Sequence, residues 1–254
     1  MAKLHNKIAV ITGGGSGIGF EIAKKYVSEG CFVVICGRTL NKLNEAVKNI
    51  PDAEGKLLAV KADISHETEI KEMVNKAIEW KGRIDILVNN AGAMRINKPL
   101  EDTSLEEWNK VILTNISGNF LVSREVGKVM IKHNYGRIVN IGSMSGLIAN
   151  KYFHAGSYEV SKAAYQMLTK VFAVEWCKYN IRVNCIAPGY YSTEPNKRFF
   201  IENQELNNKI MDLIPLNKLG NLNELASLSA FLASDEIDYL TGVTIVVDGG
   251  YTLW

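Results

Sequence analysis

Seven short apolar segments, separated by longer amphipathic stretches, restrict the possible folds of this chain more than any other feature. The segments are almost continuously apolar and rich in valine and isoleucine, as in strands that helices cover on both faces. Alternation of such strands with helical patterns predicts an α/β fold with a parallel, doubly wound sheet. The predicted strands are residues 7–12, 32–36, 57–61, 84–89, 137–142, 181–187 and 243–248.

Nothing along the chain marks a domain boundary. The 254 residues contain no linker rich in proline, glycine or serine, no internal repeat and no low-complexity segment. We therefore expect a single domain over residues 1–254. The least regular part is 188–220, and residues 190–215 within it are predicted to form a lid over the substrate.

Composition excludes several classes of protein. The formal net charge of +2 is too balanced for a protein that binds nucleic acid or an anionic membrane. No apolar run reaches the length of a membrane span, and the N-terminal residues pass directly into a strand pattern. These features predict a cytoplasmic protein.

The cysteines and histidines form no recognisable metal or disulfide pattern. No Cys-x-x-Cys pair occurs, so we expect buried free thiols in a reducing compartment. The cysteines are Cys31, Cys36, Cys177 and Cys185. The histidines are scattered over His5, His66, His133 and His154. Without ligands at suitable spacing, no catalytic metal is predicted.

A glycine-rich loop follows the first predicted strand. In "ITGGGSGIGF", Gly13, Gly17 and Gly19 stand between a strand and a helix, with Gly-x-x-x-Gly-x-Gly spacing rather than Gly-x-Gly-x-x-Gly. Glycine allows a tight turn and close approach of a pyrophosphate, which the N–H groups of the helix N-terminus would bind. The loop predicts nucleotide binding; the alternative is an ordinary tight turn.

Tyr158 and Lys162 raise a chemical question. On a helix, residues four apart lie on one face, so the lysine ammonium could lower the pKa of the phenol. By itself the pair is weak, because roughly one Tyr-x-x-x-Lys match is expected by chance in a chain of this composition.

Taken together, the motifs are highly specific. They are "TGGGSGIG" (12–19), "NNAG" (89–92), Asn115, Ser143, Tyr158 with Lys162, and "APG" (187–189). In order and approximate spacing the chain resembles the short-chain dehydrogenase/reductase family, in its short soluble form, over essentially its whole length. The resemblance implies a seven-stranded Rossmann fold with the site at the carboxyl ends of the strands.

The resemblance also implies catalytic roles. Tyr158 would exchange a proton with a ketone or alcohol, and Lys162 would stabilise the phenolate and bind a ribose. Lowering a phenol pKa from about 10 to near 7 takes roughly 4 kcal/mol, which the lysine and an oxidised nicotinamide would share. Ser143 would hold the substrate oxygen, and Asn115 would anchor a water in a proton relay. The alternatives are an ordinary turn serine and an ordinary helix asparagine.

The cofactor is predicted to be NADP or NAD, with NADP favoured. Gly37 stands where NAD enzymes usually place an acid, and Arg38 could hold a 2′-phosphate. Ser16 argues the other way, because that loop position is often basic in NADP enzymes. Asn89 and Asn90 would tie neighbouring strands together. The predicted cofactor contacts are Gly13, Gly15, Ser16, Gly17, Ile18, Gly19, Arg38, Thr39, Asp63, Ile64, Asn90, Ala91, Gly92, Tyr158, Lys162, Pro188, Gly189, Tyr191 and Thr193.

Substrate residues are expected in the loops that follow the strands. The candidates are Met94, Arg95, Ser145, His154 and Tyr190. A carboxylate could be received by an arginine or lysine of these loops, although most such residues are solvated charges. The Ser143-to-Tyr158 gap of 15 residues is slightly longer than the commonest family spacing, which weakens any transfer of substrate preference.

The substrate class stays open at this stage. The segments "AVEWCKYNIRVNCIAPGYYSTEP" and "VDGGYTLW" resemble the polyol and sugar-acid reductases of the family, such as gluconate 5-dehydrogenase. The alternatives are a 3-oxoacyl thioester reductase and, in another class, a catalytically idle nucleotide sensor. Length and glycine spacing argue against an epimerase. The helical patterns 105–132 and 158–178 have apolar residues on more than one side, and the family resemblance implies a homotetramer.

Overall fold

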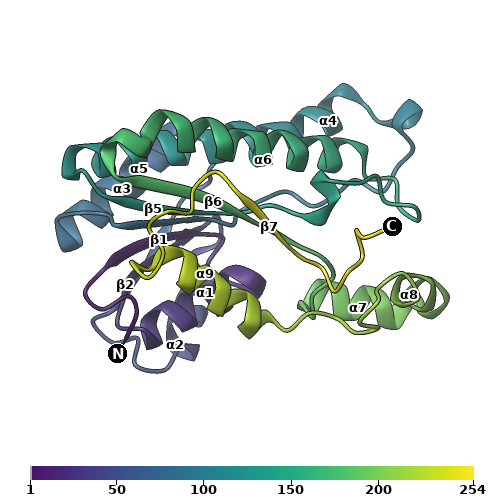
Figure 1. Ribbon diagram of the computed structural model, residues 1–254, viewed down its shortest axis with the longest axis horizontal. Coiled ribbons are helices and arrows are strands. Elements are labelled where there is room, and N and C mark those ends of the chain that lie inside the picture. Colours follow the sequence, from purple (N-terminus) through teal and green to yellow (C-terminus); the bar gives the residue numbers. More distant parts are fainter. Residues whose placement is uncertain (1) are drawn as a thin grey trace.

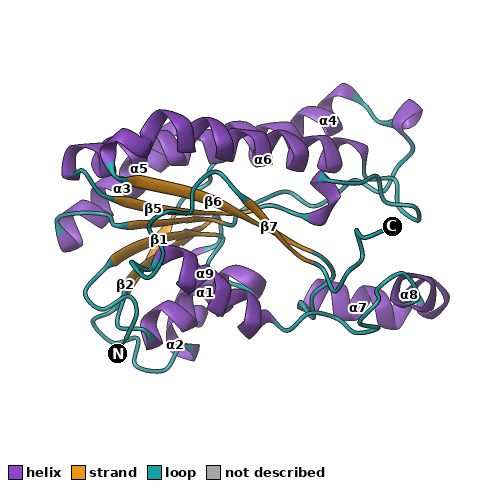
Figure 2. Ribbon diagram, in the orientation of Figure 1, coloured by secondary structure: helices purple, strands orange, loops and turns teal. Residues whose placement is uncertain are grey.

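The computed structural model describes residues 2–254, apart from the side chain of Pro195. Seven parallel strands form one sheet in the order β3-β2-β1-β4-β5-β6-β7 (Figures 1 and 2). The strands are β1 (Ile8–Thr12), β2 (Phe32–Gly37), β3 (Leu57–Lys61), β4 (Ile86–Asn89), β5 (Gly136–Ile141), β6 (Ile181–Pro188) and β7 (Thr244–Val247). The predicted fold class is confirmed.

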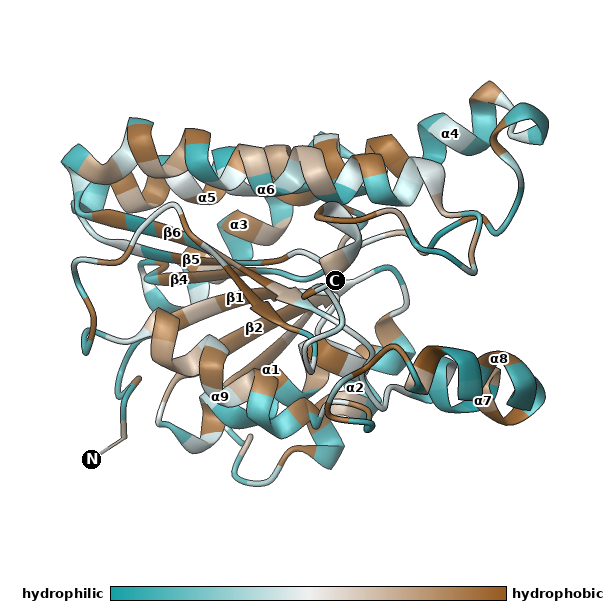
Figure 3. Ribbon diagram, turned by 45° about the vertical axis from the view of Figure 1, so that its right-hand side comes forward, coloured by the Kyte–Doolittle hydropathy of each residue, from teal (hydrophilic) through white to brown (hydrophobic). Residues whose placement is uncertain are grey.

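Helices cover both faces of the sheet (Figure 1). Helices α1, α2 and α9 lie on one face, and α3, α5 and α6 lie on the other. The helices are α1 (Gly17–Ser28), α2 (Leu40–Asn49), α3 (Glu67–Lys81), α4 (Leu105–Ile112), α5 (Asn119–His133), α6 (Gly156–Trp176), α7 (Glu194–Glu202), α8 (Gln204–Met211) and α9 (Leu222–Ala233). Figure 3 shows the apolar strands between helices that carry both apolar and polar residues.

Two cores explain why the strands are apolar at every position. In β1, Ala9 and Ile11 pack into the core beneath α1 and α9, while Val10 packs into the core beneath α3 and α5. In β2, Val33 packs into the core beneath α1 and α9, and Val34 packs into the core beneath α3 and α5. Successive side chains of a strand point to opposite faces, so both sets are buried when helices cover both faces.

The strand order reverses beside β1. The chain moves outward from β1 to β2 and β3, and then returns to place β4 on the other side of β1. The loops after β1 and β4 therefore separate at the carboxyl edge of the sheet and leave a crevice, which is where open α/β sheets bind ligands.

The predicted helix over 105–132 is interrupted. Helix α4 begins with a capping box in which Ser104 and Glu107 satisfy each other's backbone N–H groups, and it ends at Ile112. A π-helical segment over Leu113–Gly118 follows before α5 begins. Asn115 lies in this wider turn and is only 1% exposed, so the irregular turn directs a polar side chain inward.

The segment predicted to be a lid contains α7 and α8, which lie beside the carboxyl edge of the sheet (Figure 1). It has a small apolar core of its own. Phe200 and Ile210 from the two helices pack with Phe153, Tyr190 and Tyr251. Besides α7 and α8, these residues come from the loops after β5, β6 and β7, so the segment is attached to those loops rather than to the two main cores.

Three of the cysteines are buried as predicted, but Cys177 is exposed. The prediction was wrong for Cys177 because it begins a short 3-10 turn at the end of α6, where the chain runs along the surface. Burial raises the pKa of the Cys36 thiol to about 12. No helix in residues 2–254 is both long and apolar enough to cross a membrane.

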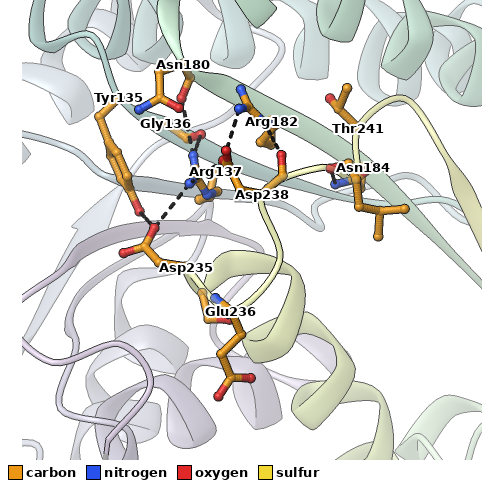
Figure 4. Close-up of polar contacts among 12 residues, drawn as sticks. Tyr135, Gly136, Arg137, Asn180, Arg182, Asn184, Asp235, Glu236, Asp238 and Thr241 are labelled. Carbon is orange, nitrogen blue, oxygen red and sulfur yellow. Dashed lines mark hydrogen bonds and ion pairs between the residues drawn. The ribbon is translucent and has the colours of Figure 1, made fainter.

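The crevice lies at the carboxyl ends of the strands. Near their amino ends, a buried arginine fixes the sheet (Figure 4). The guanidinium of Arg137 donates to the carbonyl oxygens of Gly136 and Asn180 and forms ion pairs with Asp235 at 3.1 Å and Asp238 at 3.3 Å. The Arg137 side chain is 4% exposed. This group, which we call the Arg137 clamp, joins β5 to the loop between α9 and β7.

Candidate active site

The glycine loop after β1 has the geometry of a phosphate cradle. Gly13 and Gly17 have positive φ angles of 66° and 56°, which favour glycine. A Cβ at Gly19 would collide with the carbonyl oxygen of Gly13. Helix α1 begins at Gly17, and the side chain of its N-cap, Ser16, makes no capping hydrogen bond. The first N–H groups of α1 therefore have room for an anion.

Asn90 holds this loop in place. Its side-chain amide donates to the carbonyl oxygens of Thr12 at 2.9 Å and Gly13 at 3.1 Å. In return, the Thr12 hydroxyl accepts from the backbone N–H groups of Asn90 and Ala91, both at 3.0 Å. Thr12 was not predicted as a site residue. The signal was a hydroxyl residue at the end of an otherwise apolar strand.

Asn89 joins the next pair of strands. Its amide donates to Asn140 on β5 at 3.0 Å and to Ser123 on α5 at 2.8 Å. Asn140 is the residue paired with Asn89 in the register of the two strands. The prediction that Asn89 and Asn90 tie neighbouring strands together is confirmed.

Arg38 and Asp63 follow the carboxyl ends of β2 and β3. Arg38 and Thr39 are exposed, and Arg38 has no ion-pair partner among the described residues. Burial acts to raise the pKa of Asp63, but hydrogen bonds from Ser65 and the charge of Arg38 outweigh it and lower the pKa. Ile64 is buried against the π-helical segment, where its carbonyl oxygen lies close to Gly118.

Tyr158 and Lys162 lie one turn apart on α6, as their spacing predicts. The Lys162 ammonium donates to the carbonyl oxygen of Ile141, the last residue of β5, at 2.9 Å. The same nitrogen lies 5.6 Å from the centroid of the Tyr158 ring. Lys162 is 6% exposed, so its charge is held in one place beside the tyrosine. The two side chains are therefore neighbours on one face of α6, as the Tyr-x-x-x-Lys spacing predicts.

The side chain of Asn115, in the π-helical segment, contacts α6 between Tyr158 and Lys162. Its side chain binds the backbone N–H and carbonyl oxygen of Ala93, at 2.6 and 3.2 Å, and donates to the Ser161 hydroxyl at 2.9 Å. Ser161 in turn donates to the carbonyl oxygen of Tyr158 at 2.7 Å. Ser161 was not predicted. Its only sequence signal was a hydroxyl residue between the tyrosine and the lysine.

Ser143 follows β5 directly and is fixed on both sides. Its hydroxyl accepts from the backbone N–H of Ser145 at 3.1 Å, and its carbonyl oxygen accepts from Gln166 of α6 at 2.8 Å. The hydroxyl hydrogen is not used by any of these contacts and is available to a ligand.

A cavity of about 510 Å³ connects the glycine loop with Ser143 and Tyr158. Its wall also includes the start of the lid, where the Thr193 methyl would lie 3.8 Å from a Cβ at Gly17. Glu21 and Glu194 line the cavity as well. The predicted residues that line it are Ser16, Gly17, Ile18, Asn90, Met94, Arg95, Ser143, Ser145, Tyr158, Pro188, Gly189, Tyr190, Tyr191 and Thr193.

The other predicted residues lie outside this lining. Some support the wall from behind: Gly13, Gly15, Gly19, Ala91, Gly92, Asn115 and Lys162. Arg38, Thr39, Asp63 and Ile64 lie at the ends of the next two strands. His154 is exposed, and its backbone N–H donates to Asn97 at 3.0 Å. The structure therefore places His154 outside the cavity, because the loop turns it outward.

Two tyrosines after β6 have different positions in the cavity wall. Tyr191 donates to the carbonyl oxygen of Val247 on β7 at 3.2 Å, and burial raises its pKa to about 12. Tyr190 is 7% exposed, and its hydroxyl has no hydrogen-bond partner among the described residues. Burial raises the pKa of Tyr190 above that of an ordinary phenol, so it stays protonated and can donate.

Within residues 2–254, no group of three or more histidine, cysteine, aspartate or glutamate side chains is arranged to hold a metal ion. The site instead combines an anion-binding helix N-terminus with a tyrosine, a lysine and a serine at one edge of a parallel sheet. That combination defines a dinucleotide-dependent oxidoreductase.

Comparison with known proteins identifies the family. Residues 13–252 match the family model described as enoyl-(acyl carrier protein) reductase. The chain is 37% identical to galactitol 2-dehydrogenase (L-tagatose-forming) of Cereibacter sphaeroides, over 99% of this chain and 97% of that protein. It is 36% identical to 3-oxoacyl-[acyl-carrier-protein] reductase of Thermotoga maritima, over 99% of this chain and 100% of that protein.

A solved structure agrees with these matches. A short-chain type dehydrogenase/reductase from Mycobacterium marinum superposes with a TM-score of 0.93 at 34% identity, covering 100% of this chain and 98% of that chain. The chain belongs to the short-chain dehydrogenase/reductase family and is an NAD(P)-dependent oxidoreductase.

Proposed function

We propose that this protein transfers a hydride between NADP and a carbonyl or secondary alcohol of a sugar, polyol or sugar acid. The observation that supports this most is the single cavity that joins the glycine loop to Ser143 and Tyr158. A dinucleotide whose pyrophosphate lies on α1 would extend along this cavity toward the tyrosine. The similarity to a galactitol dehydrogenase supports the substrate class.

The residues present fit a dinucleotide. Positive φ angles at Gly13 and Gly17 turn the loop, and the lack of a side chain at Gly19 brings α1 close to it. When bound, the nicotinamide would supply the hydride acceptor or donor. Asn90 and Thr12 keep the loop open for the pyrophosphate, and Lys162 would bind the nicotinamide ribose.

Tyr158 carries the proton in this proposal. In alcohol oxidation, the carbon loses a hydride while the alcohol oxygen gives its proton to the Tyr158 oxygen; in carbonyl reduction both move in reverse. The Lys162 ammonium, fixed by the carbonyl oxygen of Ile141, stabilises negative charge on that oxygen. Ser143 donates to the substrate oxygen and stabilises charge that develops on it.

Asn115 is proposed to hold a water of the proton relay behind Lys162. The side-chain amide of Asn115 donates to the carbonyl oxygen of Ala93 and to Ser161, and its side-chain oxygen accepts from the N–H of Ala93. An amide oxygen has two lone pairs, so a water near Lys162 could use the second. Gly92 leaves room there, since a Cβ at Gly92 would lie 3.1 Å from this oxygen and 3.9 Å from the Lys162 nitrogen.

NADP is proposed over NAD because of the end of β2. Gly37 offers no carboxylate to a 2′-hydroxyl, and the exposed Arg38 next to it can donate two hydrogen bonds to a 2′-phosphate. The charge of Asp63 beside Arg38 counts against this, but its carboxylate accepts two hydrogen bonds from Ser65.

We also propose a homotetramer in a reducing cytoplasm. Helix α6 exposes Val160, Met167, Val171 and Val174 along one side, and Leu105 of α4 is exposed as well. This apolar stripe is suited to a second subunit. The free cysteines fit a reducing compartment.

The deciding experiment measures oxidation of NADPH and NADH at 340 nm against ketoses, keto-sugar acids, diketones and a 3-oxoacyl thioester. Turnover of ketoses or keto acids with NADPH is expected. Turnover of the thioester alone would replace the proposal with the activity that names the Thermotoga relative. Cofactor binding with no turnover of any carbonyl would favour a nucleotide sensor.

A further inference from the structure

One arginine in the cavity wall has no acidic partner among the described residues. Arg95 is half-buried and lines the cavity together with Ser143 and Tyr158. No carboxylate among residues 2–254, as far as the structure describes them, lies within ion-pair distance of its guanidinium. A partly desolvated positive charge without a counter-ion is unfavourable unless a ligand supplies the negative charge.

The guanidinium is also held in one orientation. Its central carbon lies 3.7 Å from the centroid of the Phe153 ring, and Phe153 is itself buried in the small core beneath the lid. Stacking covers one face of the guanidinium and leaves the N–H groups at its edge free. Those N–H groups form the fork that binds a carboxylate through two hydrogen bonds.

A second unpartnered donor lies nearby. Tyr190 also lines the cavity and is more than nine-tenths buried, and its hydroxyl lacks a hydrogen-bond partner among the described residues. After burial, the neighbouring Tyr251 phenol raises the pKa of this hydroxyl, the positive charge of Arg95 lowers it and the negative charge of Glu159 raises it.

The acids of this region have partners of their own. Glu159 accepts two hydrogen bonds from Asn150, at 2.6 and 2.7 Å. Of the two glutamates in the cavity wall, Glu194 is paired with Lys197 and Glu21 with Lys24.

The other positive side chains of these loops differ from Arg95. Arg198 is 82% exposed and paired with Glu202. Lys197 is paired with Glu194, and the ammonium of Lys151 lies over the ring of Tyr152. Arg95 is therefore the one whose charge is oriented, partly desolvated and unpaired among the described residues.

We propose that Arg95 and Tyr190 form a carboxylate subsite, so that the substrate is a hydroxy or keto acid of the sugar-acid class rather than a neutral polyol. This inference rests on the proposed function and makes its substrate class narrower. The carboxylate would lie against Arg95 while the reacting hydroxyl or carbonyl group lies between Ser143 and Tyr158.

The test compares acids with neutral polyols of the same length. The kcat/KM values for D-gluconate and D-galactonate would be measured beside those for sorbitol and galactitol, with NADP and with NAD. The wild type should favour the acids at least about tenfold. Arg95→Gln should lower kcat/KM for the acids by about 30-fold, mainly through KM, and leave the polyols within about twofold. Arg95→Lys should restore part of the loss.

Two matched variants complete the design. Arg198→Gln removes an exposed guanidinium of the lid. It should change neither the kcat/KM values for the acids nor those for the polyols. Tyr190→Phe removes one neutral donor and should cost the acids about fivefold. Polyol turnover that equals acid turnover and is unaffected by Arg95→Gln would overturn the subsite while leaving the proposed function intact. A rise of the cofactor KM in Arg95→Gln that matches the rise for the acids would also overturn it.

A binding measurement separates failure of the subsite from failure of the proposed function. Calorimetric titration of gluconate and galactonate into the Tyr158→Phe protein saturated with cofactor requires no turnover. Binding that Arg95→Gln abolishes would support the subsite even if no panel compound reacted. Absence of binding by either acid would overturn it.

Discussion

Individual residues decide the chemistry through the partners that hold them. Lys162 is fixed by the carbonyl oxygen of Ile141, and Ser161, which binds the backbone carbonyl of Tyr158, is held by Asn115. The Lys162 and Ser161 contacts join α6 to β5 and to the π-helical segment, so the Lys162 ammonium is kept in place before any ligand arrives. Such preorganisation allows a fixed charge to act on a developing one without rearrangement.

Tyr158→Phe tests the proton transfer. Removing the hydroxyl should lower kcat at least about 1000-fold, because the group that exchanges the proton with the substrate oxygen is lost. Cofactor affinity should stay within about threefold, since Lys162 and the glycine loop are untouched. Steady-state kinetics and fluorescence titration of the cofactor would measure the two effects. A near-normal kcat would remove Tyr158 from the catalytic role.

Arg38→Asp tests the cofactor preference. The new carboxylate would repel a 2′-phosphate and accept from a 2′-hydroxyl, so the ratio of kcat/KM for NADPH over NADH should fall about 100-fold or more. Arg198→Asp, with the same charge change on an exposed part of the lid, serves as the control. An unchanged ratio in Arg38→Asp would place the 2′ position elsewhere.

At the scale of single elements, close packing between the glycine loop and α1 positions the phosphate site. Gly19 lies against the Gly13 carbonyl oxygen and within reach of the Asn90 amide, so even a methyl group has no room. The loop, the start of α1 and the end of β4 therefore form one rigid unit. The π-helical turn around Asn115 is a second example, since a regular α-helix would direct that side chain differently.

Gly19→Ala should damage this unit. The added Cβ would collide with Gly13 and Asn90, so α1 must shift and cofactor affinity should fall at least about tenfold. Lys24→Ala, on the exposed part of the same helix, should leave affinity unchanged. Titration of NADPH fluorescence measures both. Normal affinity in Gly19→Ala would mean that the loop can relax without loss.

At the scale of the whole molecule, the two edges of the sheet serve different purposes. The carboxyl edge holds the cavity and the lid, while the Arg137 clamp closes the amino edge (Figure 4). Burial acts to raise the pKa of Asp235, but hydrogen bonds from Lys7 and Tyr135 and the charge of Arg137 outweigh it and hold that pKa below its usual range.

The Arg137 clamp should make the free energy of unfolding depend on pH. Because the folded state lowers the pKa of Asp235, its contribution is present above the unfolded pKa of about 4 and is lost as the pH falls through the folded pKa. Asp235→Asn should cost about 1 kcal/mol at pH 7, since the side chain is 55% exposed and solvent weakens its ion pairs. The difference from wild type should shrink below about pH 4.

Urea unfolding across pH 3 to 7 would measure this difference. Glu236→Gln is the matched control, because Glu236 forms only an exposed ion pair with Lys3 and should contribute little. If Asp235→Asn lowers the free energy of unfolding equally at pH 3 and pH 7, the charge of Asp235 is not the cause of the lost stability.

Assembly is tested on α6. Val174 is 77% exposed at one end of the apolar stripe, and Val174→Glu should dissociate the proposed tetramer into smaller species in sedimentation velocity. Lys48→Glu, on the opposite face of the sheet, should leave the sedimentation profile unchanged. A wild type that sediments as a monomer would exclude the tetramer.

The sequence alone determined the sheet and the order of the motifs. Unbroken apolar strands are explicable only if helices cover both faces. The resemblance to the short-chain dehydrogenase/reductase family implied that Tyr158, Lys162 and the glycine loop lie at the carboxyl ends of the strands. The sheet was predictable because it depends on local periodicity, and the site was predictable because its motifs keep their order and spacing within the family. The exposed position of Cys177 was missed because burial at the end of a helix depends on where the next turn lies.

Only the tertiary structure decided which loop residues share the cavity. His154 and Arg95 were equal candidates in the sequence, yet His154 is exposed whereas Arg95 is stacked on Phe153 in the wall. The hydrogen bonds of Thr12 with the end of β4 and of Ser161 with the backbone of Tyr158 could not be predicted from the sequence either. These features depend on contacts between segments far apart in the chain, and sequence periodicity carries no information about the direction in which a loop side chain points.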